Sequence, residues 1–176
     1  LDMAKLLADL NNENVEGLVF DLRGNGGGAL SEAVDVAGLF FRTGPVVLVK
    51  DRQRIAYLND RDPAVAFRKP MVVLIDRTSA SASEITAGAL QDYGRAIIVG
   101  DSRTYGKGTV QQVINLAPAG APGSLKVTNA SFYRINGSST QFKGVTSDVF
   151  LPSTFEYFSE IGEDKMPNAI AWSEIS

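Results

Sequence analysis

The sequence predicts a single layered α/β domain built on a largely parallel sheet. Its 176 residues suit one compact domain that can bury a core of its own. Several short apolar runs lack alternation with polar residues, which is typical of strands buried on both faces of a parallel sheet. Segments with helical spacing of apolar residues separate these runs, and the resulting order is β-α-β-β-α-β.

The first half of the chain alternates between apolar runs and helical patterns. Strands are predicted from the continuous apolar runs, and the helix that begins at Leu30 from apolar residues spaced three and four apart. Pro63 and many polar residues favour an irregular surface segment before the third run. In chain order we predict an amphipathic helix at 1–10, a strand at 17–22, a tight glycine loop at 23–28, a helix from Leu30 to Phe41, a strand at 45–49 and a surface excursion at 51–68.

The second half opens with the same pattern and then becomes β-rich. Gly94 is the expected C-terminal stop of its helix, and Asn136-Gly137 is a strong hairpin signal. In chain order we predict a strand at 71–75, a helix that contains Ile85, Ala89 and Leu90, a strand at 96–99, half-exposed strands at 109–116 and 125–135 with a turn at 117–124 between them, and a peripheral tail at 152–176.

Composition restricts the chemistry. The chain has no histidine and no cysteine, so it cannot form a Ser-His-Asp triad, a cysteine nucleophile, a disulfide or a thiolate zinc site. A net charge of −3 and a pI near 5.0 give no electrostatic reason to expect a nucleic acid partner. No apolar run approaches the roughly 20 residues of a transmembrane helix.

A serine and a lysine are the remaining candidates for covalent catalysis. Ser81 lies where an apolar strand turns into a helix, a place where unsatisfied backbone N–H groups can stabilise an oxyanion. Lys107 lies between Gly106 and Gly108, whose flexible backbone permits a close approach, and a neutral amine in an apolar setting can serve as a base. Two structural explanations stay open: Ser81 followed by Glu84 also fits a capping box, and Lys107 also fits a solvated loop.

The glycines at 24–28 also allow more than one interpretation. They fit a simple turn, a set of N–H donors for an oxyanion, or a phosphate cradle, because Gly-x-Gly-x-x-Ala lies between a strand and a helix. Asp51 follows the next strand, about where a dinucleotide-binding domain places its ribose-binding acid. A phosphate-binding P-loop at 106–108 is a weaker match, since Gly108 stands where Ser or Thr is needed.

Four motifs, in order along the chain, together resemble the carboxyl-terminal processing, or tail-specific, proteases. They are Asp-Leu-Arg-Gly-Asn-Gly-Gly-Gly at 21–28, Ser-Ala-Ser-Ala-Ser-Glu-Ile at 79–85, Gln-Asp-Tyr-Gly-Arg-Ala at 91–96 and Tyr-Gly-Lys-Gly-Thr-Val-Gln-Gln at 105–112. Gly-Val-Thr-Ser-Asp-Val at 144–149 is similar to a later element of the same family, with Ser147 where proline is usual. The resemblance runs from about residue 15 to 151 and is closest to the periplasmic branch of Gram-negative bacteria.

The resemblance implies a Ser-Lys peptidase core at 1–151, with a layered spiral fold of the crotonase and Clp-protease type and a C-terminal β-rich extension. It implies that Ser81 is the nucleophile, that Lys107 is the general base and that Gln111 orients the lysine. The implied roles of the other matched positions are an oxyanion hole formed by Gly27, Gly28 and Ala82, and support of the site by Glu84, Asp92 and Thr104. A carboxylate such as Asp92 is more often a structural anchor, and we expect that role for it.

The resemblance also implies partners and a compartment. The expected substrates are proteins or peptides with apolar C-termini, hydrolysed through an acyl-enzyme without metal or cofactor, in the periplasm. Members of the family usually carry a PDZ domain, which we expect in the full-length protein. The interval between Ser81 and Lys107 is one residue longer than usual. The alternative function is a catalytically inactive relative that binds extended peptides by strand addition.

Overall fold

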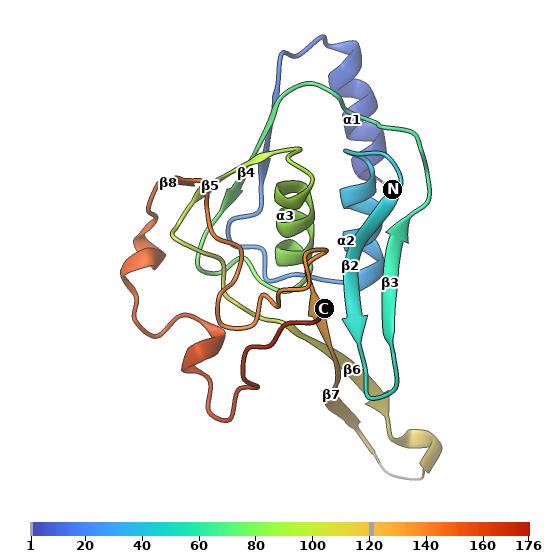
Figure 1. The fold of residues 1–176 in the computed structure, drawn as a ribbon, viewed down its shortest axis with the longest axis vertical. Coiled ribbons are helices and arrows are strands. Elements are labelled where there is room, and N and C mark those ends of the chain that lie inside the picture. The colour runs from blue at the N-terminus through green and yellow to red at the C-terminus, as the bar shows by residue number, and fades with distance from the viewer. Residues whose placement is uncertain (1, 120–121) are drawn as a thin grey trace.

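The computed structural model describes residues 2–119 and 122–176 and contains two four-stranded sheets (Figure 1). The first sheet is parallel and has the strand order β1 (Leu18–Asp21), β4 (Met71–Ile75), β5 (Ile97–Gly100), β8 (Val149–Phe150). The second sheet is antiparallel, in the order β3 (Ile55–Asp60), β2 (Gly44–Lys50), β7 (Ser124–Tyr133), β6 (Thr109–Asn115). The α/β class is confirmed, but only half of the strands are parallel.

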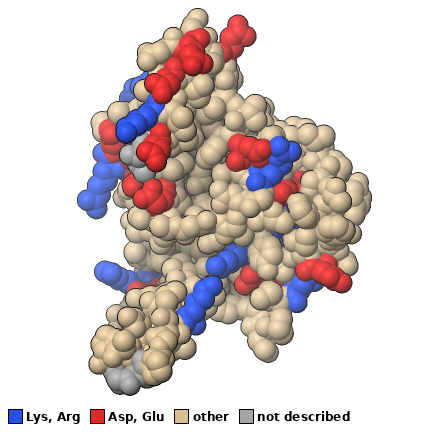
Figure 2. Space-filling view, turned by 180° about the vertical axis from the view of Figure 1, so that it is seen from behind, with Lys and Arg blue, Asp and Glu red and all other residues tan. Residues whose placement is uncertain are grey.

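Three α-helices accompany the sheets: α1 (Asp2–Asn12), α2 (Leu30–Gly38) and α3 (Ala82–Asp92). Helices α2 and α3 pack against each other, and α3 contacts strands of both sheets (Figure 1). The core between them includes fully buried side chains such as Phe40, Phe67 and Phe132. Figure 2 shows the opposite face, on which acidic and basic side chains are interspersed and the β6–β7 hairpin projects from the body. None of the described helices has the length and apolar character needed to cross a bilayer.

Two predicted elements are wrong. No strand was expected within the surface excursion at 51–68, but this segment contains β3, which pairs antiparallel with β2 in the second sheet. The predicted helix from Leu30 ends at Gly38, although Phe40 and Phe41 beyond its end are still buried.

The turn and stop signals are confirmed. Asn136-Gly137 forms a turn that closes an antiparallel bridge between Tyr133 and Ser139. Gly94 follows the end of α3 with a φ of +61°.

The parallel sheet determines where the motifs meet. The glycine loop at 23–28 follows β1. The turn at 76–81 that carries Ser81, here called the serine turn, follows β4, and the segment that carries Lys107 follows β5. These three strands are neighbours and run parallel, so their following loops lie at the same edge of the sheet. The carboxyl ends of strands are where open α/β sheets bind ligands.

Candidate active site

The glycine loop is joined to the serine turn by direct hydrogen bonds. The Ala80 N–H and the Ser83 hydroxyl both donate to the carbonyl of Asn25, each at 3.0 Å. On the other side, the Gly24 N–H donates to Asp76 Oδ2 at 3.1 Å. These bonds fix the two loops as one unit at the end of the parallel sheet.

Ser81 occupies a strained position at the start of α3. It is the N-cap residue, with φ 59° and ψ −114°, a combination that costs a non-glycine residue about 1–3 kcal/mol. Its N–H donates to Glu84 Oε2 at 2.8 Å, which is one of the two hydrogen bonds of a capping box. A simple cap adopts extended backbone angles, however, and capping alone does not explain this strain.

Two of the three expected oxyanion donors remain suitable. The Gly27 N–H donates to Asn25 Oδ1 at 3.0 Å and is therefore engaged. Gly27 instead supports the serine turn by close approach, because a Cβ there would lie 2.7 Å from the Ala80 carbonyl oxygen and 2.8 Å from Ser81 Cβ. Gly28 borders open space among the described residues, and Ala82 is the first residue of α3, whose N–H has no intrahelical acceptor.

Glu84 connects the serine to the lysine segment. Its buried carboxylate accepts the N–H groups of Ser81, Gly106 and Lys107 at 2.8, 2.7 and 3.0 Å, and the Thr104 hydroxyl at 2.6 Å. Burial raises the pKa of Glu84 to about 7, and these four donors oppose the rise. Glu84 thus contacts both Ser81 and the Lys107 segment, and Thr104 contacts Glu84.

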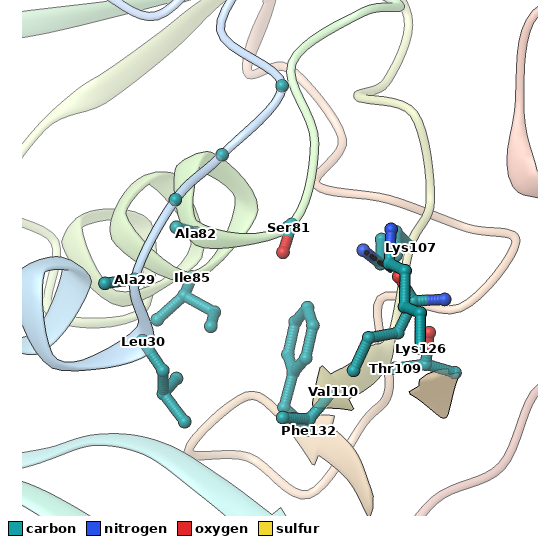
Figure 3. Close-up of a pocket in the computed structure, with 14 residues that line it drawn as sticks. Ala29, Leu30, Ser81, Ala82, Ile85, Lys107, Thr109, Val110, Lys126 and Phe132 are labelled. Carbon is teal, nitrogen blue, oxygen red and sulfur yellow. Dashed lines mark hydrogen bonds between the residues drawn. The ribbon is translucent and has the colours of Figure 1, made fainter. Parts of the chain in front are cut away.

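Lys107 and Ser81 line one pocket of about 430 Å³, together with Gln111. Lys107 is half-buried, and its Nζ lies 3.4 Å from Gln111 Oε1. In Figure 3 the Ser81 hydroxyl points into the pocket, with Ile85 on one side and Lys107 on the other. Ser81 and Lys107 are not hydrogen-bonded to each other in this structure.

The pocket also has an apolar part that sequence reasoning did not identify. It is lined by Leu30, Ile85, Val110 and Phe132, with Lys126 also on its wall (Figure 3). The sequence gives no local signal for Phe132 or Lys126, because both come from β7, which reaches the pocket only through the second sheet. The apolar part could accommodate an uncharged side chain next to Ser81.

Asp92 lies apart from this pocket. It is the last residue of α3, eleven positions beyond Ser81, and it forms an ion pair of 2.6 Å with Arg134. This ion pair ties the C-terminal end of α3 to Arg134, and a structural role for Asp92 stays a prediction.

The dinucleotide-binding interpretation is wrong. It requires a second strand parallel to β1 in the same sheet, but β2 belongs to the antiparallel sheet. Asp51 already has hydrogen-bond partners of its own, since its Oδ1 accepts the Gln53 and Arg54 N–H groups of the β2–β3 turn. These bonds lower the pKa of Asp51.

Comparisons with known proteins agree with this geometry. The model of peptidase family S41 matches residues 1–151. The tail-specific protease of Haemophilus influenzae is 49% identical over an alignment of 183 positions, which covers 99% of this chain and 26% of that protein. The carboxy-terminal-processing protease of Bartonella bacilliformis is 38% identical, over 88% of this chain and 36% of that protein.

Comparison with solved structures also finds C-terminal processing proteases. The photosystem II D1 C-terminal processing protease is 37% identical and superposes with a TM-score of 0.75, over 85% of this chain and 38% of that one. Mature CPAF complexed with lactacystin, at 17% identity and a TM-score of 0.71, covers 93% of this chain and shows the fold alone. This chain spans only 26% and 36% of the two curated relatives described above. The resemblance to carboxyl-terminal processing proteases is confirmed, and the chain belongs to peptidase family S41.

Proposed function

We propose that this chain is the catalytic core of a serine endopeptidase that cleaves proteins at or near apolar C-terminal tails. The observation that carries the proposal is the shared pocket, where a strained serine at a helix start and a half-buried lysine face one cavity. Family membership and relatives named as tail-specific and carboxy-terminal-processing proteases support the reaction class.

In the proposed reaction, Ser81 Oγ attacks the scissile carbonyl while neutral Lys107 Nζ takes its proton. Lys107 then returns the proton to the leaving amine, and water hydrolyses the acyl-enzyme by the same route. Gln111 Oε1, 3.4 Å from Lys107 Nζ, orients the amine. The N–H groups of Gly28 and Ala82 stabilise the oxyanion.

The proposed reaction requires one local movement. Because Ser81 and Lys107 are not hydrogen-bonded here, Lys107 Nζ must move towards Ser81 while it stays within reach of Gln111 Oε1. Catalytic hydrogen bonds often tighten only when substrate binds. The backbone of Lys107 needs no such adjustment, since Glu84 already fixes it relative to Ser81.

The proposal extends to the whole protein. Substrates with apolar C-termini fit the apolar wall of the pocket, a PDZ domain is expected in the full-length protein, and the periplasm is the proposed compartment. The Haemophilus influenzae relative is named a tail-specific protease, which supports cleavage at C-terminal tails. The PDZ domain and the periplasmic compartment stay predictions from the family resemblance.

The proposal is tested by the cleavage of an unfolded protein with an apolar C-terminus. Ser81→Ala and Lys107→Ala should each abolish cleavage and leave the circular dichroism spectrum unchanged. Lys50→Ala is the control, because it removes an exposed lysine at the end of β2, outside this pocket, and it should retain cleavage. Cleavage by purified Ser81→Ala would contradict the proposal, and peptide binding without any turnover would favour a non-catalytic binding module.

A further inference from the structure

The two glycines beside Lys107 pack against a short segment, residues 139–142, which we call the shelf. A Cβ at Gly108 would lie 2.5 Å from Ser139 Oγ and 2.7 Å from the backbone nitrogen of Gln141. A Cβ at Gly106 would lie 2.9 Å from the Phe142 carbonyl carbon. The glycines on either side of Lys107 therefore permit a close approach to the shelf.

The shelf holds the lysine segment by three hydrogen bonds. The Thr140 hydroxyl donates to the Lys107 carbonyl at 2.8 Å, and the Phe142 N–H donates to the Gly106 carbonyl at 2.7 Å. The Gly108 N–H donates to Gln141 Oε1 at 2.8 Å, and Gln141 is only 3% exposed. Because Glu84 binds the N–H of Lys107 from the other side, the lysine backbone is fixed in both directions.

The C-terminal tail in turn holds the shelf. Gln141 Nε2 donates to the Ile170 carbonyl at 2.8 Å, and Trp172 Nε1 donates to the Ser139 carbonyl at 2.9 Å. Lys143, directly after the shelf, lies 3.4 Å over the Trp172 ring. The family match ends at residue 151, so these tail contacts come from a segment outside it.

We propose that Gln141 is a positioning residue for Lys107, anchored by the tail segment 170–172. This inference rests on the proposed function, in which Lys107 is the base. The carboxamide of Gln141 uses its oxygen for the residue after the lysine and its nitrogen for the tail. If either bond of the Gln141 carboxamide is lost, the lysine segment is held less firmly against the shelf. A small misplacement of a catalytic group strongly reduces the rate of the catalysed reaction.

The test compares Gln141→Leu with Gln91→Leu in the 176-residue chain. Gln91 is a matched control, because its carboxamide also joins two segments, with Nε2 bonded to the Thr146 carbonyl at 2.9 Å, but at the far end of α3. Labelling of Ser81 by a fluorophosphonate is measured against pH. Gln141→Leu should slow labelling about 10- to 100-fold and change its pH dependence, because the surroundings of the reacting amine change.

Hydrogen exchange provides a readout that does not depend on activity. The Gly108 amide should exchange faster in Gln141→Leu and not in Gln91→Leu. If Gln141→Leu does not fold, Trp172→Phe replaces it, because this variant keeps the aromatic ring and loses the bond to Ser139. Trp172→Phe should change labelling in the same direction by a smaller factor.

The outcomes separate this inference from the proposed function. Equal effects of Gln141→Leu and Gln91→Leu on the labelling rate and its pH dependence would overturn the positioning role, while Ser81 labelling in the parent chain would leave the proposed function standing. Failure of the parent chain to label at Ser81 would overturn both.

Discussion

The two ends of helix α3 carry carboxylates in contrasting surroundings. Asp92 at the C-terminal end pairs with the Arg134 guanidinium at 2.6 Å, with the side chains 11% and 16% exposed. Glu84 at the N-terminal end is fully buried and binds four neutral donors, and no ion pair joins it to a Lys or Arg in the described part of the chain. The C-terminal end of α3 is joined to Arg134 by an ion pair. The N-terminal end holds a buried carboxyl group that bonds to the backbone of both Ser81 and Lys107, and burial of this group is unfavourable.

The contrast between Asp92 and Glu84 indicates that the unfavourable interactions lie at the N-terminal end of α3, next to Ser81. Arg134 compensates the burial of Asp92 by an ion pair with two charge-assisted hydrogen bonds, at 2.6 and 3.0 Å. Glu84 has no compensating charge, and burial raises its pKa to about 7. Strain at Ser81 lies at the same end of the helix, and such costs concentrate at functional sites.

The largest expected effect is that of Glu84→Ala. It leaves the N–H groups of Ser81, Gly106 and Lys107 without their acceptor, and each unpaired buried donor costs about 1–3 kcal/mol. We expect a loss of about 3 kcal/mol or more in the free energy of unfolding and a fall of about 100-fold or more in the rate of cleavage. Urea unfolding and a cleavage assay measure the two effects. A variant that cleaves at the parent rate would remove Glu84 from the site.

The second effect is a pH dependence of stability. Burial raises the pKa of Glu84 in the folded state to about 7, above its ordinary value of 4.5. Protonation of Glu84 therefore stabilises the fold at low pH, and this stability is lost as the pH rises through 7. Relative to Glu84→Gln, the parent should lose about 2–3 kcal/mol of unfolding free energy between about pH 5 and pH 8. Parallel pH curves for the two proteins would show that Glu84 does not titrate in this range.

Asp92→Asn should have a smaller effect, confined to stability. It weakens the charge-assisted bonds to Arg134, which we expect to cost about 2 kcal/mol, while cleavage stays within about 3-fold of the parent rate. Thermal unfolding and the same cleavage assay make the comparison with Glu84→Ala. If Asp92→Asn lowered the rate of cleavage as much as Glu84→Ala does, the claim that only the N-terminal end of α3 supports the site would be contradicted.

A third carboxylate gives the smallest effect. Asp21 pairs with Arg23 at 2.7 Å near the glycine loop, but the Arg23 and Asp21 side chains are 51% and 46% exposed. Asp21→Asn should therefore change the free energy of unfolding by less than about 0.5 kcal/mol at physiological salt. A larger loss in urea unfolding would indicate that this pair, too, supports the loop.

The loops of the site follow from sequence better than their supports do. Apolar runs before the glycine loop, the serine turn and the lysine segment predict parallel strands, whose carboxyl ends bring the three loops together. The strand β3 was missed because its half-exposed residues lie in a polar segment with Pro63. Thr140 and Gln141 could not be identified, since their partners at 107 and 108 lie 33 residues away and depend on tertiary contact.

The most direct test of the central claim is to map the residue that a fluorophosphonate acylates, by mass spectrometry of the parent chain and of Lys107→Ala. The account predicts modification of Ser81 in the parent chain and its near-complete loss in Lys107→Ala, with the fold retained. Modification at another residue, or undiminished labelling of Ser81 without Lys107, would contradict the pairing of this serine and this lysine.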